Sequence, residues 1–129
     1  MDKMDKEVLI TDKAPKSVGP YSQMVKCGDF LFISGQISAD VKTGEIVHQD
    51  VTKQTHTIMR TIKDMLDDAG SNMDKVVKCS VHLSDAIYFE EMNNVYLQYF
   101  DNGYPARITV SGVQLYDGVN VEIDVIAAV

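Results

Sequence analysis

The sequence predicts an α+β fold in which a mixed β-sheet carries two helices packed on one face. Hydrophobic residues recur with a period of two near both ends of the chain and with a helical period in two segments between them. The order of elements is strands, helix, strand, helix and strands, which is typical of a two-layer sandwich. Because the chain has no linker or repeat, we expect residues 1–129 to form one domain, with 1–7 as a flexible N-terminal extension.

The first part of the chain is expected to form short strands. The candidates span 8–10, 21–26 and 30–34, and the last two are separated by a tight turn at Cys27-Gly28-Asp29. Residues 14–20 contain two prolines and a glycine, which exclude a regular element.

The helical segments come next, on either side of one strand. Apolar residues recur at helical spacing over 51–69, with Asp50 as the expected N-cap and Gly70 just after the C-terminus. Alternation over 77–83 predicts a half-buried strand. A second helix is expected from Ser84 or Asp85 to about Phe100. Its inward residues should be Met92, Tyr96 and Tyr99.

The last two strands, 107–111 and 121–127, carry polar residues at alternate positions. If the apolar residues of both strands face the helices, the polar ones share the opposite face of the sheet. The residues expected on that face are Arg107, Thr109, Glu122 and Asp124. A mixed face of this kind is often covered by other subunits.

Arg107 is one of only two arginines, against ten lysines. A fixed guanidinium at a strand end can bind a carboxylate or a phosphate through two parallel hydrogen bonds. Two interpretations stay open, since the register between the last two strands is unknown. Arg107 forms a cross-strand ion pair with Glu122, or it binds a substrate carboxylate while Glu122 acts as an acid/base group.

Composition narrows the classes of function. The net charge of −7 and the absence of a basic cluster argue against a nucleic-acid partner. Cys27 and Cys79 have no metal-ligand spacing and are expected to be buried free thiols, which suits a reducing compartment. The N-terminus has no signal-peptide pattern, and no stretch approaches the roughly 20 apolar residues of a membrane span. We therefore expect a soluble, cytoplasmic protein without a metal site or cofactor.

Seven motifs resemble the RidA/YjgF family of reactive-intermediate deaminases, and together they run from about Ala14 to Ala127. They are Gly19-Pro20-Tyr21-Ser22-Gln23, Ser34-Gly35-Gln36-Ile37, Leu66-Asp67-Asp68-Ala69-Gly70, Val76-Val77-Lys78, Asn93-Asn94-Val95-Tyr96, Pro105-Ala106-Arg107 and Val121-Glu122-Ile123. The resemblance implies a chorismate-mutase-like fold and a homotrimer whose sheets form a central barrel, with active clefts at the subunit interfaces. It also implies hydrolysis of 2-imino acids and enamines, such as 2-aminoacrylate or 2-iminopropionate, to 2-keto acids and ammonia.

The resemblance also implies roles for single residues. Arg107 would bind the substrate carboxylate, and Glu122 would activate water. The remaining site residues would be Tyr21, Ser34, Gly35, Asn93 and Thr109, the last through its backbone. The implied reaction needs positioning and acid/base help, and neither a metal nor an organic cofactor.

The chain departs from the family pattern at several positions. Thr109 stands where relatives carry cysteine, Tyr116 replaces a proline after Leu115, and His82 replaces a smaller or aromatic residue. The alternatives to a deaminase are a non-catalytic trimeric binder of small keto or amino acids, and an endoribonuclease or translation inhibitor. The net charge, the scarcity of arginine and the lack of a catalytic histidine pair argue against the nuclease. Chaperone-like binding is a further possibility that the sequence does not test.

Overall fold

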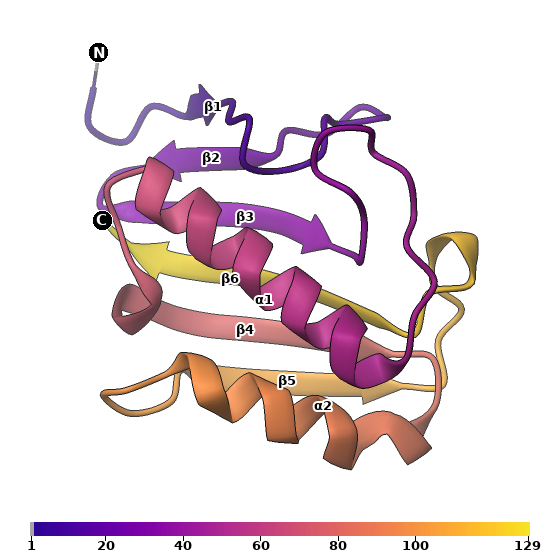
Figure 1. Ribbon diagram of the computed structural model, residues 1–129. Coiled ribbons are helices and arrows are strands. Elements are labelled where there is room, and N and C mark those ends of the chain that lie inside the picture. The colour runs from indigo at the N-terminus through magenta and orange to yellow at the C-terminus, as the bar shows by residue number, and fades with distance from the viewer. Residues whose placement is uncertain (1) are drawn as a thin grey trace.

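The computed structural model describes residues 2–129, and in this part of the chain six strands form one mixed sheet in the order β1-β2-β3-β6-β4-β5. Two helices, α1 and α2, cover one face of this sheet (Figure 1). The predicted α+β fold class is therefore confirmed. The strands are β1 (Glu7–Leu9), β2 (Met24–Cys27), β3 (Phe30–Gln36), β4 (Val76–Leu83), β5 (Ala106–Ser111) and β6 (Val121–Ala128). The helices are α1 (Val51–Asp68) and α2 (Phe89–Tyr96), with short 3₁₀ segments at Met73–Lys75, Ala86–Tyr88, Leu97–Tyr99 and Tyr116–Gly118.

The sheet is mixed because β5 runs parallel to its neighbour β4, whereas all the other pairs are antiparallel. The parallel connection between β4 and β5 contains α2, as the geometry of a crossover requires. We call the face of the sheet that carries no helix the open face.

Helix α1 follows the sequence prediction closely. The Asp50 side chain accepts a hydrogen bond from the backbone N–H of Lys53, so the N-cap is confirmed. Gly70 has a φ of +81°, the left-handed conformation expected of a residue that follows a helix. The buried face of α1 packs on β3 and β6. It comprises Val51, Gln54, Thr55, Ile58, Met59, Thr61, Ile62, Met65 and Leu66.

The second helical segment is shorter than predicted. It begins with a 3₁₀ turn whose N–H at Ile87 is capped by Asp85, and it ends in another 3₁₀ turn. Only Phe89–Tyr96 is α-helical, because 3₁₀ turns often replace the ends of helices. Met92 and Tyr96 are buried as expected, and Tyr99 is half-buried.

Two strand predictions are wrong, each for a local reason. Val77 is 45% exposed, since the β4–β6 register shifts between Val76 and Lys78 and turns Val77 out of the core. The predicted orientation of β5 is reversed. Ile108 is 53% exposed and lies on the open face.

Register fixes the orientation of β5. Arg107 lies opposite Cys79 of β4, which lies opposite Val125 of β6, and both neighbours are buried under the helices. Laterally paired residues point to the same face of a sheet. Arg107 and Thr109 are therefore on the helix-covered face, whereas Glu122 and Asp124 are on the open face. The predicted orientation is thus right for β6 and wrong for β5. The apolar residues of β5 were misassigned because the open face is itself rich in apolar side chains.

The N-terminal segment lies against the turn between β2 and β3. Lys3 Nζ is 2.9 Å from the carboxylate of Asp29, and the N–H of Gly28 donates to the Lys3 carbonyl. Met1 lies outside the described residues, and the flexibility of 1–7 stays a prediction. No helix among residues 2–129 has the length and apolar character needed to cross a membrane.

Candidate functional site

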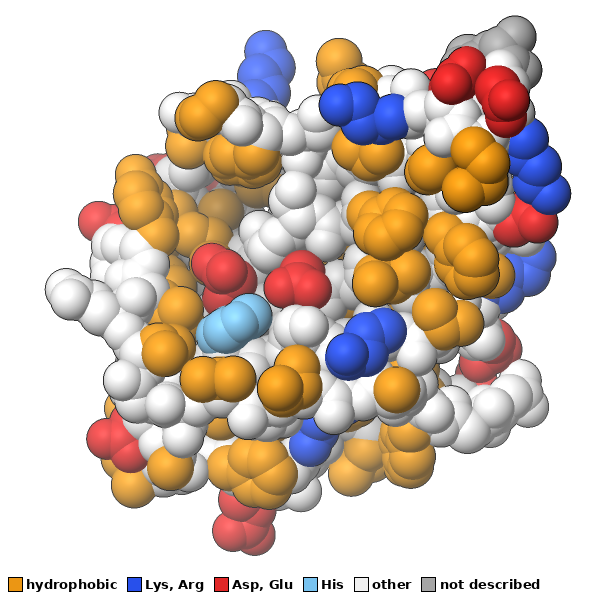
Figure 2. All heavy atoms as spheres, turned by 180° about the vertical axis from the view of Figure 1, so that it is seen from behind, with side chains coloured by type: hydrophobic (Ala, Val, Ile, Leu, Met, Phe, Trp, Pro, Cys, Tyr) orange, Lys and Arg blue, Asp and Glu red, His pale blue; other side chains and the backbone are white. Residues whose placement is uncertain are grey.

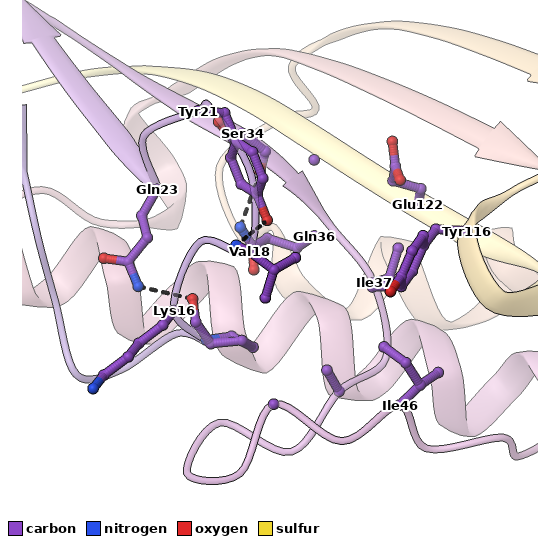
Figure 3. A pocket seen from close by; sticks show the side chains of 14 residues that line it. Lys16, Val18, Tyr21, Gln23, Ser34, Gln36, Ile37, Ile46, Tyr116 and Glu122 are labelled. Carbon is purple, nitrogen blue, oxygen red and sulfur yellow. Dashed lines mark hydrogen bonds between the residues drawn. The ribbon is translucent and has the colours of Figure 1, made fainter.

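Glu122 lies half-buried on β6 at the wall of a cleft of about 450 Å³, which we call the acidic cleft. Its other walls come from β3, from the segments before β2 and after β3, and from the loop before β6 (Figure 3). The lining residues are Pro15, Lys16, Val18, Tyr21, Gln23, Ser34, Gly35, Gln36, Ile37, Ala39, Gly44, Ile46, Tyr116 and Glu122. Three of the predicted site residues, Tyr21, Ser34 and Gly35, thus share a cleft with Glu122.

Gly35 is placed directly beside the Glu122 carboxyl group. A Cβ atom at position 35 would lie 2.7 Å from Glu122 Oε1 and 2.9 Å from its Cδ, closer than real Cβ contacts allow. The β3–β6 register shifts between Ile33 and Gln36, where this close approach occurs. The Ser-Gly pair in the sequence therefore marks the point where backbone and carboxylate meet.

Hydrogen bonds hold the Tyr21 side of the acidic cleft. Ser34 Oγ donates to the carbonyl of Ser22 at 2.6 Å, and the Val18 N–H donates to the Tyr21 hydroxyl at 3.4 Å. The buried Gln23 amide anchors the segment that leads into this wall. It accepts from the N–H of Thr11 and donates to three carbonyls, those of Thr11, Ala14 and Pro15.

The environment of Glu122 suits a general base. Burial raises the pKa of Glu122 above that of an ordinary glutamate, nearby His82 acts in the opposite direction, and Asp124 adds to the rise. A carboxyl whose pKa moves toward neutrality is a better proton acceptor and donor in catalysis.

Arg107 lies in a second group of side chains, the arginine cluster, which we define by Asn93, Tyr96, Arg107 and Thr109. The guanidinium donates to Asn93 Oδ1 at 2.7 Å, and its Cζ lies 4.8 Å from the centre of the Tyr96 ring. Asn93 and Tyr96 are one helical turn apart on α2, so a single face of the helix fixes the guanidinium. The Phe89 ring adds a third contact at 5.7 Å.

The groups around Arg107 do not neutralise its charge. Burial raises the pKa of the Cys79 thiol to about 11, and burial likewise raises the pKa of Tyr96. Both groups are therefore protonated and uncharged at neutral pH. Arg107 forms no ion pair with a carboxylate among the described residues. The arginine cluster thus presents a positively charged guanidinium that an anion can neutralise.

The two clusters do not meet within one chain. On β4, His82 lies opposite Glu122 and Cys79 lies opposite Arg107. His82 and Cys79 are three positions apart along this strand. Two strand spacings and three residue rises separate the Cα atoms of Glu122 and Arg107 by roughly 14 Å, with the side chains on opposite faces. The interpretation of Arg107 and Glu122 as a cross-strand ion pair is therefore wrong.

Three further features bear on the predicted site. Thr109 belongs to the arginine cluster, and its Oγ1 is buried and has no hydrogen-bond partner. Sequence reasoning missed the support of Arg107 by Tyr96, although the i, i+3 spacing from Asn93 was a usable signal. Residues 2–129 contain no cluster of three or more His, Cys, Asp or Glu side chains arranged for a metal ion.

Comparison with known proteins places the chain in a family. The model of the family described as Endoribonuclease L-PSP matches residues 11–129. A RutC family protein of Pyrococcus abyssi is 46% identical over 124 residues, which cover 96% of this chain and 98% of that protein. This chain belongs to the RidA/L-PSP family. A RidA relative from Bos taurus, named 2-iminobutanoate/2-iminopropanoate deaminase, is 36% identical, and the match covers 98% of this chain and 93% of the relative.

Solved structures of RidA/L-PSP proteins share the fold. TdcF of E. coli, solved with bound serine, has a TM-score of 0.88 and is 35% identical to this chain. The match covers 95% of this chain and 98% of TdcF. RidA membership and the deaminase name of the bovine relative agree with the resemblance found in the sequence motifs.

Proposed function

We propose that this protein is a hydrolytic deaminase of 2-imino acids and their enamine forms, such as 2-aminoacrylate and 2-iminopropionate, and that it releases 2-keto acids and ammonia. The observation that carries the proposal is the arginine cluster. Its guanidinium is oriented by Asn93 and Tyr96 but has no carboxylate partner among the described residues. The deaminase name of the bovine relative supports the same reaction class.

In the proposed mechanism, Arg107 binds the substrate carboxylate through two parallel N–H donors and so fixes the imine carbon. Water attacks this carbon, and the electron pair of the C=N bond moves to nitrogen. Glu122 accepts the proton from water and returns it to nitrogen. A second proton shift from oxygen to nitrogen then lets the C–N bond break, so that ammonia leaves and the C=O bond forms. The net reaction consumes one water and neither gains nor loses a proton.

The separation of the two clusters implies that the reacting site forms between chains. We infer a homotrimer in which the acidic cleft of one copy faces the arginine cluster of the next. The open face supports this inference, because hydrophobic side chains gather on it (Figure 2). The apolar residues that point to this face are Val25, Phe30, Phe32, Val77, Ile108, Val110 and Ile126. A contiguous apolar surface of this kind is typical of a subunit interface.

The test couples this protein to an enzyme that releases 2-aminoacrylate or 2-iminobutyrate and follows the appearance of the keto acid. Wild-type protein should accelerate keto-acid formation, and Arg107→Ala and Glu122→Gln should retain only a small residual acceleration. Refolding the two variants together at equal amounts should restore about a quarter of the wild-type activity, because one in four interfaces would combine an intact arginine with an intact glutamate. No acceleration by the wild type would refute the deaminase. No recovery in the mixture would refute the site between chains.

A second candidate function is the binding of small amino or keto acids without turnover. The serine-bound structure of TdcF favours it. The two functions predict different results for Glu122→Gln. If the protein is a deaminase, Glu122→Gln should lose turnover but keep its affinity for a keto acid. If the protein is a binder, the wild type itself should bind the keto acid without accelerating imine hydrolysis. If single-stranded RNA stays intact after incubation with this protein at physiological salt, the nuclease alternative is wrong.

A further inference from the structure

His82 lies next to Glu122 on the open face of the sheet. The two residues are direct partners across the antiparallel β4–β6 pair, and both are half-buried. Cβ atoms of such partners are about 4.5–5.5 Å apart, so an imidazole and a carboxylate in these positions can reach each other. The resemblance to known relatives gave no role to His82, which replaces a smaller or aromatic residue.

The His82 ring carries an unmet hydrogen-bonding requirement. Its Nδ1 atom is buried and has no hydrogen-bond partner. A buried ring nitrogen without a partner costs free energy, which a hydrogen bond to a neighbouring acceptor would recover. Few groups around the His82 ring can accept a hydrogen bond from it. Val110 and Ile108 of β5 are apolar, and the helices lie on the far side of the sheet.

The ionisable groups that face His82 come from β4 and β6. Glu122 lies opposite, Asp124 lies opposite Ser80 and is therefore diagonal to His82, and Lys78 stands four residues back on the same strand. Figure 2 shows a histidine side chain close to acidic side chains on this face. Glu122 is thus the nearest carboxylate partner, and Asp124 is the second.

We propose that His82 is the positioning residue of Glu122, and that its imidazole, as a hydrogen-bond donor, orients the carboxylate that serves as the base of the reaction. This inference rests on the proposed function for its catalytic meaning. Burial alone would keep Glu122 protonated to a higher pH, and the His82 charge offsets part of that effect. His82 acts through Glu122 and need not touch the substrate.

The decisive experiment compares the pH dependence of kcat/KM in wild type and His82→Phe, which puts an aromatic ring of similar size in place of the imidazole. The acidic limb of the profile should move to higher pH in the variant, because the imidazole that lowers the pKa of Glu122 has been removed. At high pH, where Glu122 is ionised in both proteins, kcat/KM should converge. His56→Gln changes a histidine on the helix-covered side and should leave the profile unchanged.

A second readout does not depend on turnover. The Glu122 carboxyl is titrated by NMR in wild type and in His82→Phe, and its midpoint should rise when the neighbouring imidazole is removed. An unmoved acidic limb in His82→Phe, or an unmoved Glu122 midpoint in the same variant, would overturn the proposal. His82→Gln replaces His82→Phe if the latter does not fold. If the wild type shows no imine hydrolysis, the proposed function fails, and the NMR titration alone decides whether the two side chains are coupled.

Discussion

Gly35→Ala is the sharpest test of the acidic cleft, because it moves the Glu122 carboxylate without touching its chemistry. The new Cβ would lie 2.7 Å from Oε1, whereas ordinary contact begins near 3.4 Å. The carboxylate must therefore shift by about 0.7 Å, close to the misplacement of about 1 Å that can lower a rate about 100-fold. Gly35 does not have a positive φ, so the backbone accepts alanine. The cost of moving a flexible side chain is about 1 kcal/mol.

We therefore expect Gly35→Ala to keep its fold, with a change of only a few degrees in Tm, and to lose about 99% of kcat/KM in the coupled imine assay. Gly19→Ala is the matched control, since a Cβ there makes ordinary contacts of 3.5 Å and longer. The same alanine placed in a Glu122→Gln background should cause little further loss, because both changes act on one group. Full activity in Gly35→Ala, or an equal loss in both backgrounds, would refute the reasoning.

Three other predictions follow from the same geometry. Arg107→Lys keeps the charge but not the two parallel donors, so kcat/KM in the imine assay should fall about 10- to 100-fold with Tm little changed; a near-wild-type value would argue against carboxylate binding. The raised pKa of Glu122 means that the folded chain holds this proton more tightly than the unfolded chain, so ionisation destabilises the fold. Glu122→Gln should thus unfold at a higher temperature than wild type at neutral pH, and the difference should vanish below the pKa of glutamate in the unfolded chain. In a denaturant titration, Gln23→Ala should lower the free energy of unfolding by about 2–4 kcal/mol, because it breaks four buried or partly buried hydrogen bonds. The control Gln98→Ala, at an exposed position, should change the free energy of unfolding by less than about 0.5 kcal/mol.

The fold was predictable wherever one face of an element is apolar and the other is polar. Helix α1 has this pattern, and its cap at Asp50 and its end at Gly70 were visible in the sequence. The alternation in β6 was equally clear. Strand β5 was not predictable in this way, since Ile108 and Val110 point to an open face that is apolar in its own right. Periodicity shows which residues share a face but not which face is covered.

The family motifs indicate candidate site residues one by one, and their roles stay a prediction, but the arrangement of these residues in space was not predictable. The contact between Gly35 and Glu122 depends on a register shift that no local pattern indicates. The placement of Arg107 under α2 depends on the crossover between β4 and β5. Both are long-range properties of the sheet, so residue identity alone leaves them open.

The opposite placement of Arg107 and Glu122 has a consequence for how activity responds to dilution. Under the proposed arrangement, a single folded chain carries two half-sites that belong to different reaction centres. Specific activity should then fall as the protein is diluted below the concentration at which the copies separate, although each chain stays folded. Catalytic activity would therefore measure the association of the copies. A substrate bound between two copies would in turn stabilise their association.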